Sequence, residues 1–214
     1  MAQHLHRAGY QTAVFVANPN AGTLSGLERG VDVFREGWVE FTYYGRENHE
    51  ESSRVMHDAF WRWRGAYPAE PYWVHFQTTD VHRPWKTVVP FAGLFITAEL
   101  RETFYEWDEQ LRAAEGRWFG RFEKTGISRI AYYDAARGLY DETMAHQDYQ
   151  LGRLVERLKA RGEWERTLLI VASDHSTHSA GAEFARGMLD SLRPHWEETD
   201  PPPPIFRSSV SRIP

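Results

Sequence analysis

The chain of 214 residues contains no cysteine. Disulfide bonds, thiolate metal sites and a cysteine nucleophile are therefore excluded within it. No run approaches the ~18 consecutive apolar residues that a helix needs to span a bilayer, so no membrane span is expected. Polar residues such as Gln3, His4, His6 and Arg7 interrupt the beginning of the chain, which lacks the apolar stretch of a signal peptide. The localisation stays open.

The distribution of charged residues also bears on which kinds of partner the chain can bind. The formal net charge is −5, and residues of both signs are interspersed without a basic stripe or arm. Nucleic acid is therefore not an expected partner. No glycine-rich phosphate loop and no Gly-x-Ser-x-Gly elbow follows a predicted strand, which disfavours nucleotide binding and a serine-hydrolase triad. The length favours one domain over residues 1–214, and the oligomeric state is left open.

Apolar patterning predicts an alternation of helices and strands. Residues 12–17, 72–77 and 167–172 are short runs of β-favouring residues bounded by polar or turn residues. Residues 50–64 and 134–161 carry apolar side chains at the 3.6-residue period of a helix. This alternation is typical of a layered α/β fold with a mostly parallel sheet.

Three smaller features complete this organisation. Ser52 and Ser53 are candidates to cap the first long helix. Residues 86–130 are expected to form a helical insertion, with 99–112 as its best helical stretch. Residues 195–214 contain four consecutive prolines and are expected to form a stiff, extended connector.

Polar side chains follow each predicted strand, where α/β sheets bind their ligands. Asp174 and His175 follow the last strand and offer a carboxylate and an imidazole, ligand types that suit Mg²⁺, Ca²⁺, Mn²⁺ or Zn²⁺. The alternative is an aspartate that caps a helix beside a surface histidine.

A second polar pair, Asp80 and His82, follows the strand at 72–77. His82 could contact an anion or act as a general acid, with Asp80 orienting its ring. The alternative is an aspartate that braces a turn before Pro84. Asp32 lies in a Gly-flanked turn and is expected to be structural.

Several segments together resemble the sulfatases of the alkaline-phosphatase-like superfamily. Each similarity is short, and the order and spacing of the segments over residues 5–176 strengthen the resemblance. The segments are Ala8-Gly-Tyr-x-Thr12, Gly26 to Phe34, Asp80-x-His82-x-Pro84, the helix Tyr140 to Leu154, and Thr167 to His175.

The resemblance implies a fold, a metal and three site residues. The implied fold is an incomplete α/β domain with a mostly parallel sheet sandwiched by helices. Asp174 and His175 match the second pair of ligands to one divalent metal ion, Ca²⁺ or Mg²⁺, with Mn²⁺ or Zn²⁺ as alternatives. His82 matches a histidine that touches the sulfate or phosphate group, so the implied partner is a small anionic ester substrate.

The resemblance also shows what these residues lack. In the family the nucleophile is a formylglycine made in a Cys/Ser-x-Pro-x-Arg motif, and an Asp-Asp metal pair precedes it. Neither element occurs in this sequence. We therefore expect an internal fragment of a sulfuric-ester hydrolase, inactive by itself. The alternatives are a non-catalytic binding protein with the sulfatase fold, a phosphodiester or phosphonate monoester hydrolase, and an unrelated α/β protein with incidental His and Asp clusters.

Overall fold

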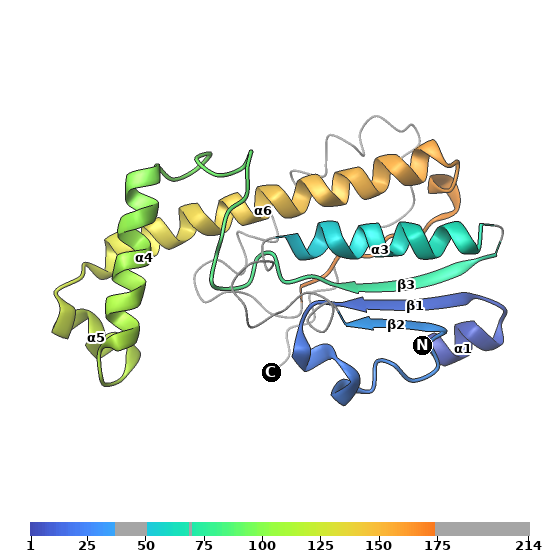
Figure 1. Cartoon of the computed structure of the whole chain (residues 1–214), viewed down its shortest axis with the longest axis horizontal. Helices are drawn as coiled ribbons and strands as arrows, with labels where there is room; N and C mark the ends of the chain where they lie inside the picture. Colours follow the sequence, from blue (N-terminus) through green and yellow to red (C-terminus); the bar gives the residue numbers. More distant parts are fainter. Residues whose placement is uncertain (37–50, 69, 174–214) are drawn as a thin grey trace, which may run out of the picture. The chain divides into compact units, whose positions relative to one another are not determined.

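The structure is a computed structural model, and it describes residues 1–36, 51–68 and 70–173. The chain divides into two compact units, residues 1–164 and 165–214. The elements described below belong to the first unit, which contains all of the strands that the structure describes (Figure 1). The predicted connector at 195–214 lies outside the described residues.

Three parallel strands form the sheet, in the order β2-β1-β3. They are β1 (Gln11–Val16), β2 (Val33–Glu36) and β3 (Tyr72–Gln77). The central strand β1 is buried from Thr12 to Val16, which explains its unbroken apolar run. The predictions of an α/β fold, a parallel sheet, and strands at 12–17 and 72–77 are confirmed.

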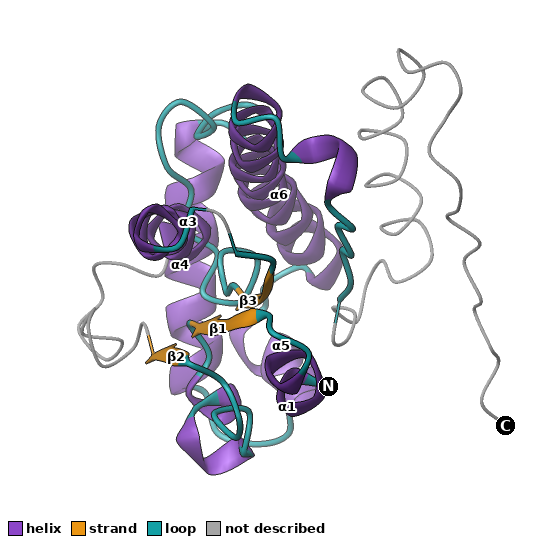
Figure 2. Cartoon of the chain, turned by 90° about the vertical axis from the view of Figure 1, so that its right-hand side faces the viewer, coloured by secondary structure: helices purple, strands orange, loops and turns teal. Residues whose placement is uncertain are grey.

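Helices α3 (Ser52–Ala66) and α6 (Arg129–Ala160) cover one face of the sheet (Figure 2). The core between these helices and the sheet is rich in aromatic side chains, and Phe60 contacts Phe76 edge to face with their ring centroids 5.5 Å apart. Its buried members are Ala13, Phe15, Ala17, Met56, Phe60, Trp61, Trp63, Leu154 and Leu158.

A smaller cluster packs against the opposite face of the sheet. Val14, Val16 and Ala21 are buried there, and the short helices η1 (Pro19–Ala21) and η2 (Thr23–Ser25) follow β1. The N-terminal helix α1 (Ala2–Arg7) lies on this side in both ribbon views (Figures 1 and 2). Asp32 accepts hydrogen bonds from the backbone N–H and the hydroxyl of Thr12, both at 2.8 Å, so it is structural, as expected.

Two further helices come between β3 and α6 in the sequence. They are α4 (Ala98–Ala113) and α5 (Trp118–Thr125), and α4 confirms the predicted helix at 99–112. Thr97 caps α4 by accepting a hydrogen bond from the backbone of Leu100. Phe104 of α4 stacks on Tyr132 of α6 with their ring centroids 5.0 Å apart, which joins these two helices.

Two helix starts differ from the prediction. α6 begins at Arg129 rather than 134, because Ser128 caps it by accepting a hydrogen bond from the backbone N–H of Ala131. The prediction that Ser52 and Ser53 cap α3 is wrong. Both serines lie in the first turn of α3, and their hydroxyl groups donate to Asp80 instead.

The predicted strand at 167–172 is also wrong. Residues 167–173 form no helix or strand, and the side chains of Leu168 and Ile170 are 84% and 71% exposed. An apolar run becomes a strand only when a neighbouring strand pairs with its backbone, and no described strand does so here. The third strand of the sheet is instead β2, which was not predicted. β2 is short, and its backbone pairs with that of β1.

No helix among the described residues is long and apolar enough to cross a membrane.

His57 makes the stability of the fold dependent on pH. Its ring is 8% exposed and packs edge to face on Phe76, and this burial lowers its pKa to about 4. The unfolded chain therefore binds this proton at a higher pH than the folded chain does. Stability should fall as the pH falls from about 6.5 to about 4, by up to ~1.4 kcal/mol per pH unit from this group.

The substitution His57→Gln should remove this part of the pH dependence. Urea unfolding at several pH values between 4 and 8 would measure it, with His4→Gln as the matched control because His4 is exposed. Equal slopes for wild type and His57→Gln would contradict the assignment.

Candidate functional site

The turn that follows β3 is fixed by a buried carboxylate. Asp80 is 3% exposed, and it accepts hydrogen bonds from the backbone N–H and the hydroxyl of Ser53, both at 2.9 Å. The hydroxyl of Ser52 also donates to Asp80, and its oxygen accepts a hydrogen bond of 2.8 Å from the backbone N–H of Thr79. The start of a helix has unpaired backbone N–H groups and a partial positive charge, and both favour a carboxylate nearby. Asp80 occupies this position at the start of α3.

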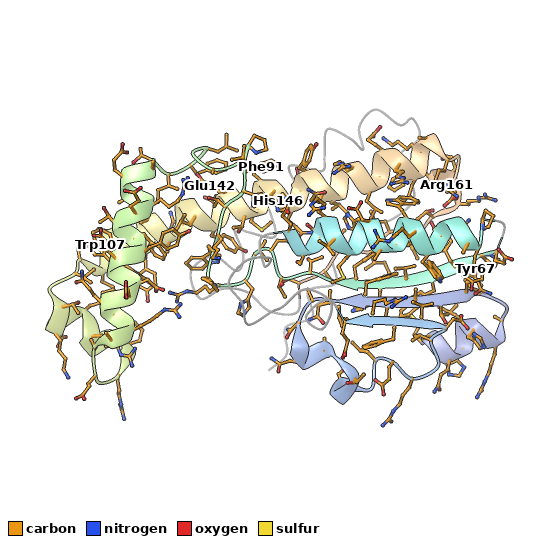
Figure 3. The ribbon with its side chains drawn as sticks, viewed as in Figure 1. Tyr67, Phe91, Trp107, Glu142, His146 and Arg161 are labelled. Carbon is orange, nitrogen blue, oxygen red and sulfur yellow. The ribbon has the colours of Figure 1, made fainter. Side chains whose placement is uncertain are left out.

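His146 lies on the long helix α6 (Figure 3), and its ring faces the same carboxylate. The Nδ1 atom of His146 lies 3.4 Å from Asp80 Oδ1, and its Nε2 atom lies 3.0 Å from Gln150 Nε2. An amide nitrogen can only donate, so His146 Nε2 accepts and Nδ1 carries the proton that faces Asp80. All three side chains are buried, which makes this a directional network beneath the turn.

His82 projects from this turn into solvent. Its backbone N–H donates to Thr79 O at 2.9 Å, and its ring Nδ1 pairs with the carbonyl oxygen of Arg83. Because a carbonyl only accepts, Nδ1 carries the proton in the neutral ring, and Nε2 is the atom that can accept one. The side chain is exposed. The hypothesis that Asp80 orients the ring is wrong, because the Asp80 carboxylate binds α3 and faces α6; the turn-bracing alternative is the observed one.

The residues after His82 are held by α4 and α6. Arg83 Nη2 lies 2.6 Å from Asp108 Oδ1, and the Tyr132 hydroxyl donates to the same oxygen at 2.6 Å. Burial first, and then the hydrogen bond to Asp108, raise the pKa of Tyr132, so this hydroxyl stays protonated. The indole N–H of Trp85 donates to Val81 O at 3.1 Å. The turn is therefore fixed on both sides of His82.

The two predicted metal ligands, Asp174 and His175, lie outside the described residues. Their role therefore stays a prediction, and the structure does not place them relative to His82. Within the described ranges, no group of three or more His, Asp or Glu side chains could hold a metal ion.

Sequence reasoning missed a buried carboxylate on α6. Glu142 is fully buried and accepts hydrogen bonds from the backbone N–H groups of Gly93 and Phe95 at 2.7 and 3.3 Å. It also accepts one from Arg101 at 3.1 Å, and Figure 3 labels it beside His146 on the same helix. Both residues lie on the same face of the helix as the predicted apolar stripe, three and seven positions after Leu139, and this spacing was the available signal.

The match to a protein-family model agrees with the sequence resemblance. A protein-family model described as Sulfatase matches residues 1–204, which is most of the chain. A search of curated protein sequences gave no match. The chain is similar to a solved structure, the lipoteichoic acid synthase LtaP from Listeria monocytogenes, with 18% sequence identity and a TM-score of 0.39. That similarity covers 76% of this chain and 33% of LtaP, so this chain spans about a third of its length.

The role of Glu142 in joining the 93–101 segment to α6 can be tested by substitution. Glu142→Gln keeps the shape of the side chain and removes the charge that faces Arg101. The free energy of unfolding should fall by about 2 kcal/mol, because buried hydrogen bonds to a charged group are weakened. Urea denaturation measures this, with the exposed Glu102→Gln as control. A change within about 0.5 kcal/mol for both variants would contradict the assignment.

Proposed function

This chain belongs to the sulfatase family, and we propose that it carries part of the site of a metal-dependent hydrolase of small anionic esters. Sulfate esters are the proposed substrate class, and His82 is proposed to contact the anionic group. Membership of the family sets aside the reading of the chain as an unrelated α/β protein. The activity of a whole protein that contains these residues is part of the proposal.

The placement of His82 carries the proposal. An exposed imidazole stands at the carboxyl end of β3, where ligands of α/β sheets bind. Its backbone is fixed, which keeps the loss of backbone entropy on binding small, and its ring is open to solvent. With Nδ1 directed to a carbonyl, Nε2 is the atom that would hold a proton and face an anion.

A divalent ion is the second component of the proposal. Asp174 and His175 are the proposed ligands, since a carboxylate and an imidazole together suit Ca²⁺, Mg²⁺, Mn²⁺ or Zn²⁺. When bound, such an ion supplies Lewis-acid polarisation of an ester oxygen. His82, from the end of β3, would supply hydrogen bonding to the anionic group.

A binding protein with the sulfatase fold is the second candidate. One observation favours it: the 214 residues contain no cysteine and no Ser-x-Pro-x-Arg segment, so the nucleophile that the family resemblance implies has no counterpart among them. Hydrolysis of phosphodiesters or phosphonate monoesters is a variant of the first candidate. It differs in the ester cleaved and uses the same anion contact.

Turnover separates these candidates. We expect this chain alone, with Ca²⁺ or Mg²⁺, to release little product from p-nitrophenyl sulfate or bis(p-nitrophenyl) phosphate, because no nucleophile of the family type is present. A spectrophotometric assay of p-nitrophenol measures this. Sustained turnover that His82→Ala abolishes would show instead that these residues hold a complete active site.

Anion binding tests the role of His82 directly. Titration with inorganic sulfate should shift the amide resonances of residues 79–85 in the wild-type chain. His82→Ala should weaken this binding about tenfold, the loss expected when a hydrogen bond to a charged group is removed. His4→Ala is the matched control, since His4 is an exposed histidine on α1. Equal sulfate affinity for wild type and His82→Ala would rule out the proposed contact.

A further inference from the structure

We propose that Asp80 is the positioning residue of the anion contact: its carboxylate, bound to Ser52 and Ser53 and faced by His146, fixes the turn that presents His82. This inference rests on the proposed function of His82 as the group that touches the anion. Asp80 itself is buried and touches no substrate in this proposal.

The first step of the argument is the connection between Asp80 and His82. The backbone N–H of His82 donates to Thr79 O, and the backbone N–H of Thr79 donates to the hydroxyl of Ser52. That hydroxyl in turn donates to Asp80. Asp80 thus holds the Ser52 hydroxyl, to which the backbone N–H of Thr79 donates. The carbonyl oxygen of Thr79 in turn accepts the hydrogen bond from His82 that closes the turn. The path consists of consecutive hydrogen bonds from the carboxylate to the backbone of His82.

The second step concerns how the carboxylate is held. A helix cap requires one acceptor for one or two backbone N–H groups. Asp80 instead accepts from one backbone N–H and two hydroxyl groups, and the Nδ1 atom of His146 lies 3.4 Å away. Three donors from α3 therefore fix the orientation of this carboxylate, and not only its position, while the imidazole of His146 on α6 lies beside it. Thr78 adds another connection to α6, because its hydroxyl donates to Gln147 at 3.1 Å.

The third step is that the rest of the turn is fixed independently of Asp80. Arg83 is held by Asp108 and Tyr132, and Val81 by the indole of Trp85. A change at Asp80 should therefore loosen the hydrogen bonds of Thr79 and of the His82 backbone, while the contacts of Arg83 and Trp85 stay in place. The predicted defect is local, and it can be separated from loss of the fold.

Three variants test the proposal in the full chain. Asp80→Asn keeps the shape of the side chain and removes the charge. Ser52→Ala removes the hydroxyl between Thr79 and Asp80, and Ser52→Thr restores a hydroxyl at the same position. Glu142→Gln is the matched control, because it weakens a buried carboxylate network on α6 whose partners lie at 93–101 rather than in the turn.

Two measurements are needed for each variant. Hydrogen exchange of the His82 amide reports on the turn without any ligand, and the affinity for inorganic sulfate reports on the presentation of the ring. Asp80→Asn and Ser52→Ala should speed the exchange about tenfold and weaken sulfate binding about tenfold, the change expected when a hydrogen bond to a charged group is lost. Ser52→Thr should restore both values, and Glu142→Gln should leave both unchanged.

The outcomes separate this inference from the proposed function. Unchanged exchange at His82 in Asp80→Asn and Ser52→Ala overturns the positioning role, whether or not sulfate binds. Faster exchange with unchanged sulfate affinity also overturns it, since the fixed turn would then not serve the contact. If the wild-type chain binds no sulfate, the proposed function of His82 fails, and the positioning of the turn by Asp80 is judged by the exchange measurement alone. If Glu142→Gln loses as much sulfate affinity as Asp80→Asn, the loss comes from general destabilisation, and the positioning role of Asp80 is overturned.

Discussion

A carboxylate that leaves water must find donors for both of its oxygens, and Asp80 finds them at the first turn of α3, with His146 of α6 beside it. This requirement determines how the end of β3 is arranged. The strand must stop where its next residues can reach the start of α3, and α6 must pass close enough for His146 to face the same group. The exposed position of His82 follows, because Asp80 points inward and the closed turn leaves His82 outward.

The segment between β3 and α6 is held by the same kind of interaction. Glu142 accepts from two backbone N–H groups and from Arg101, and Asp108 accepts from Arg83, Arg112 and Tyr132. In each case a carboxylate joins segments that are distant in sequence, while the aromatic contact of Phe104 with Tyr132 supplies the apolar packing.

Membership of the sulfatase family fits this arrangement. The segment Asp80-x-His82-x-Pro84 is one of the segments that carry the resemblance, and the structure separates the tasks of its two polar residues. Asp80 is buried and braces the turn, whereas His82 is exposed at the end of the sheet. The spacing of two residues therefore reflects opposite orientations rather than a shared task in one cleft.

Local patterns predicted most of the regular elements. The apolar runs of β1 and β3 and the periodicity of α3, α4 and α6 depend on which faces a segment buries, and the order of residues carries that information. Two errors have one cause. β2 was missed and a strand at 167–172 was predicted, because pairing with a neighbouring strand is a property of the sheet and not of the segment.

The sequence by itself determined that a histidine and an aspartate follow β3 and that the chain carries the sulfatase pattern. It also determined the absence of a cysteine from these residues. Only the tertiary structure decided that Asp80 binds Ser52 and Ser53 instead of the His82 ring, and that the side chains of Glu142 and His146 are buried. The physical reason is that a buried polar group is satisfied by whichever donors folding brings to it, and these donors lie 27 residues or more from Asp80 along the chain.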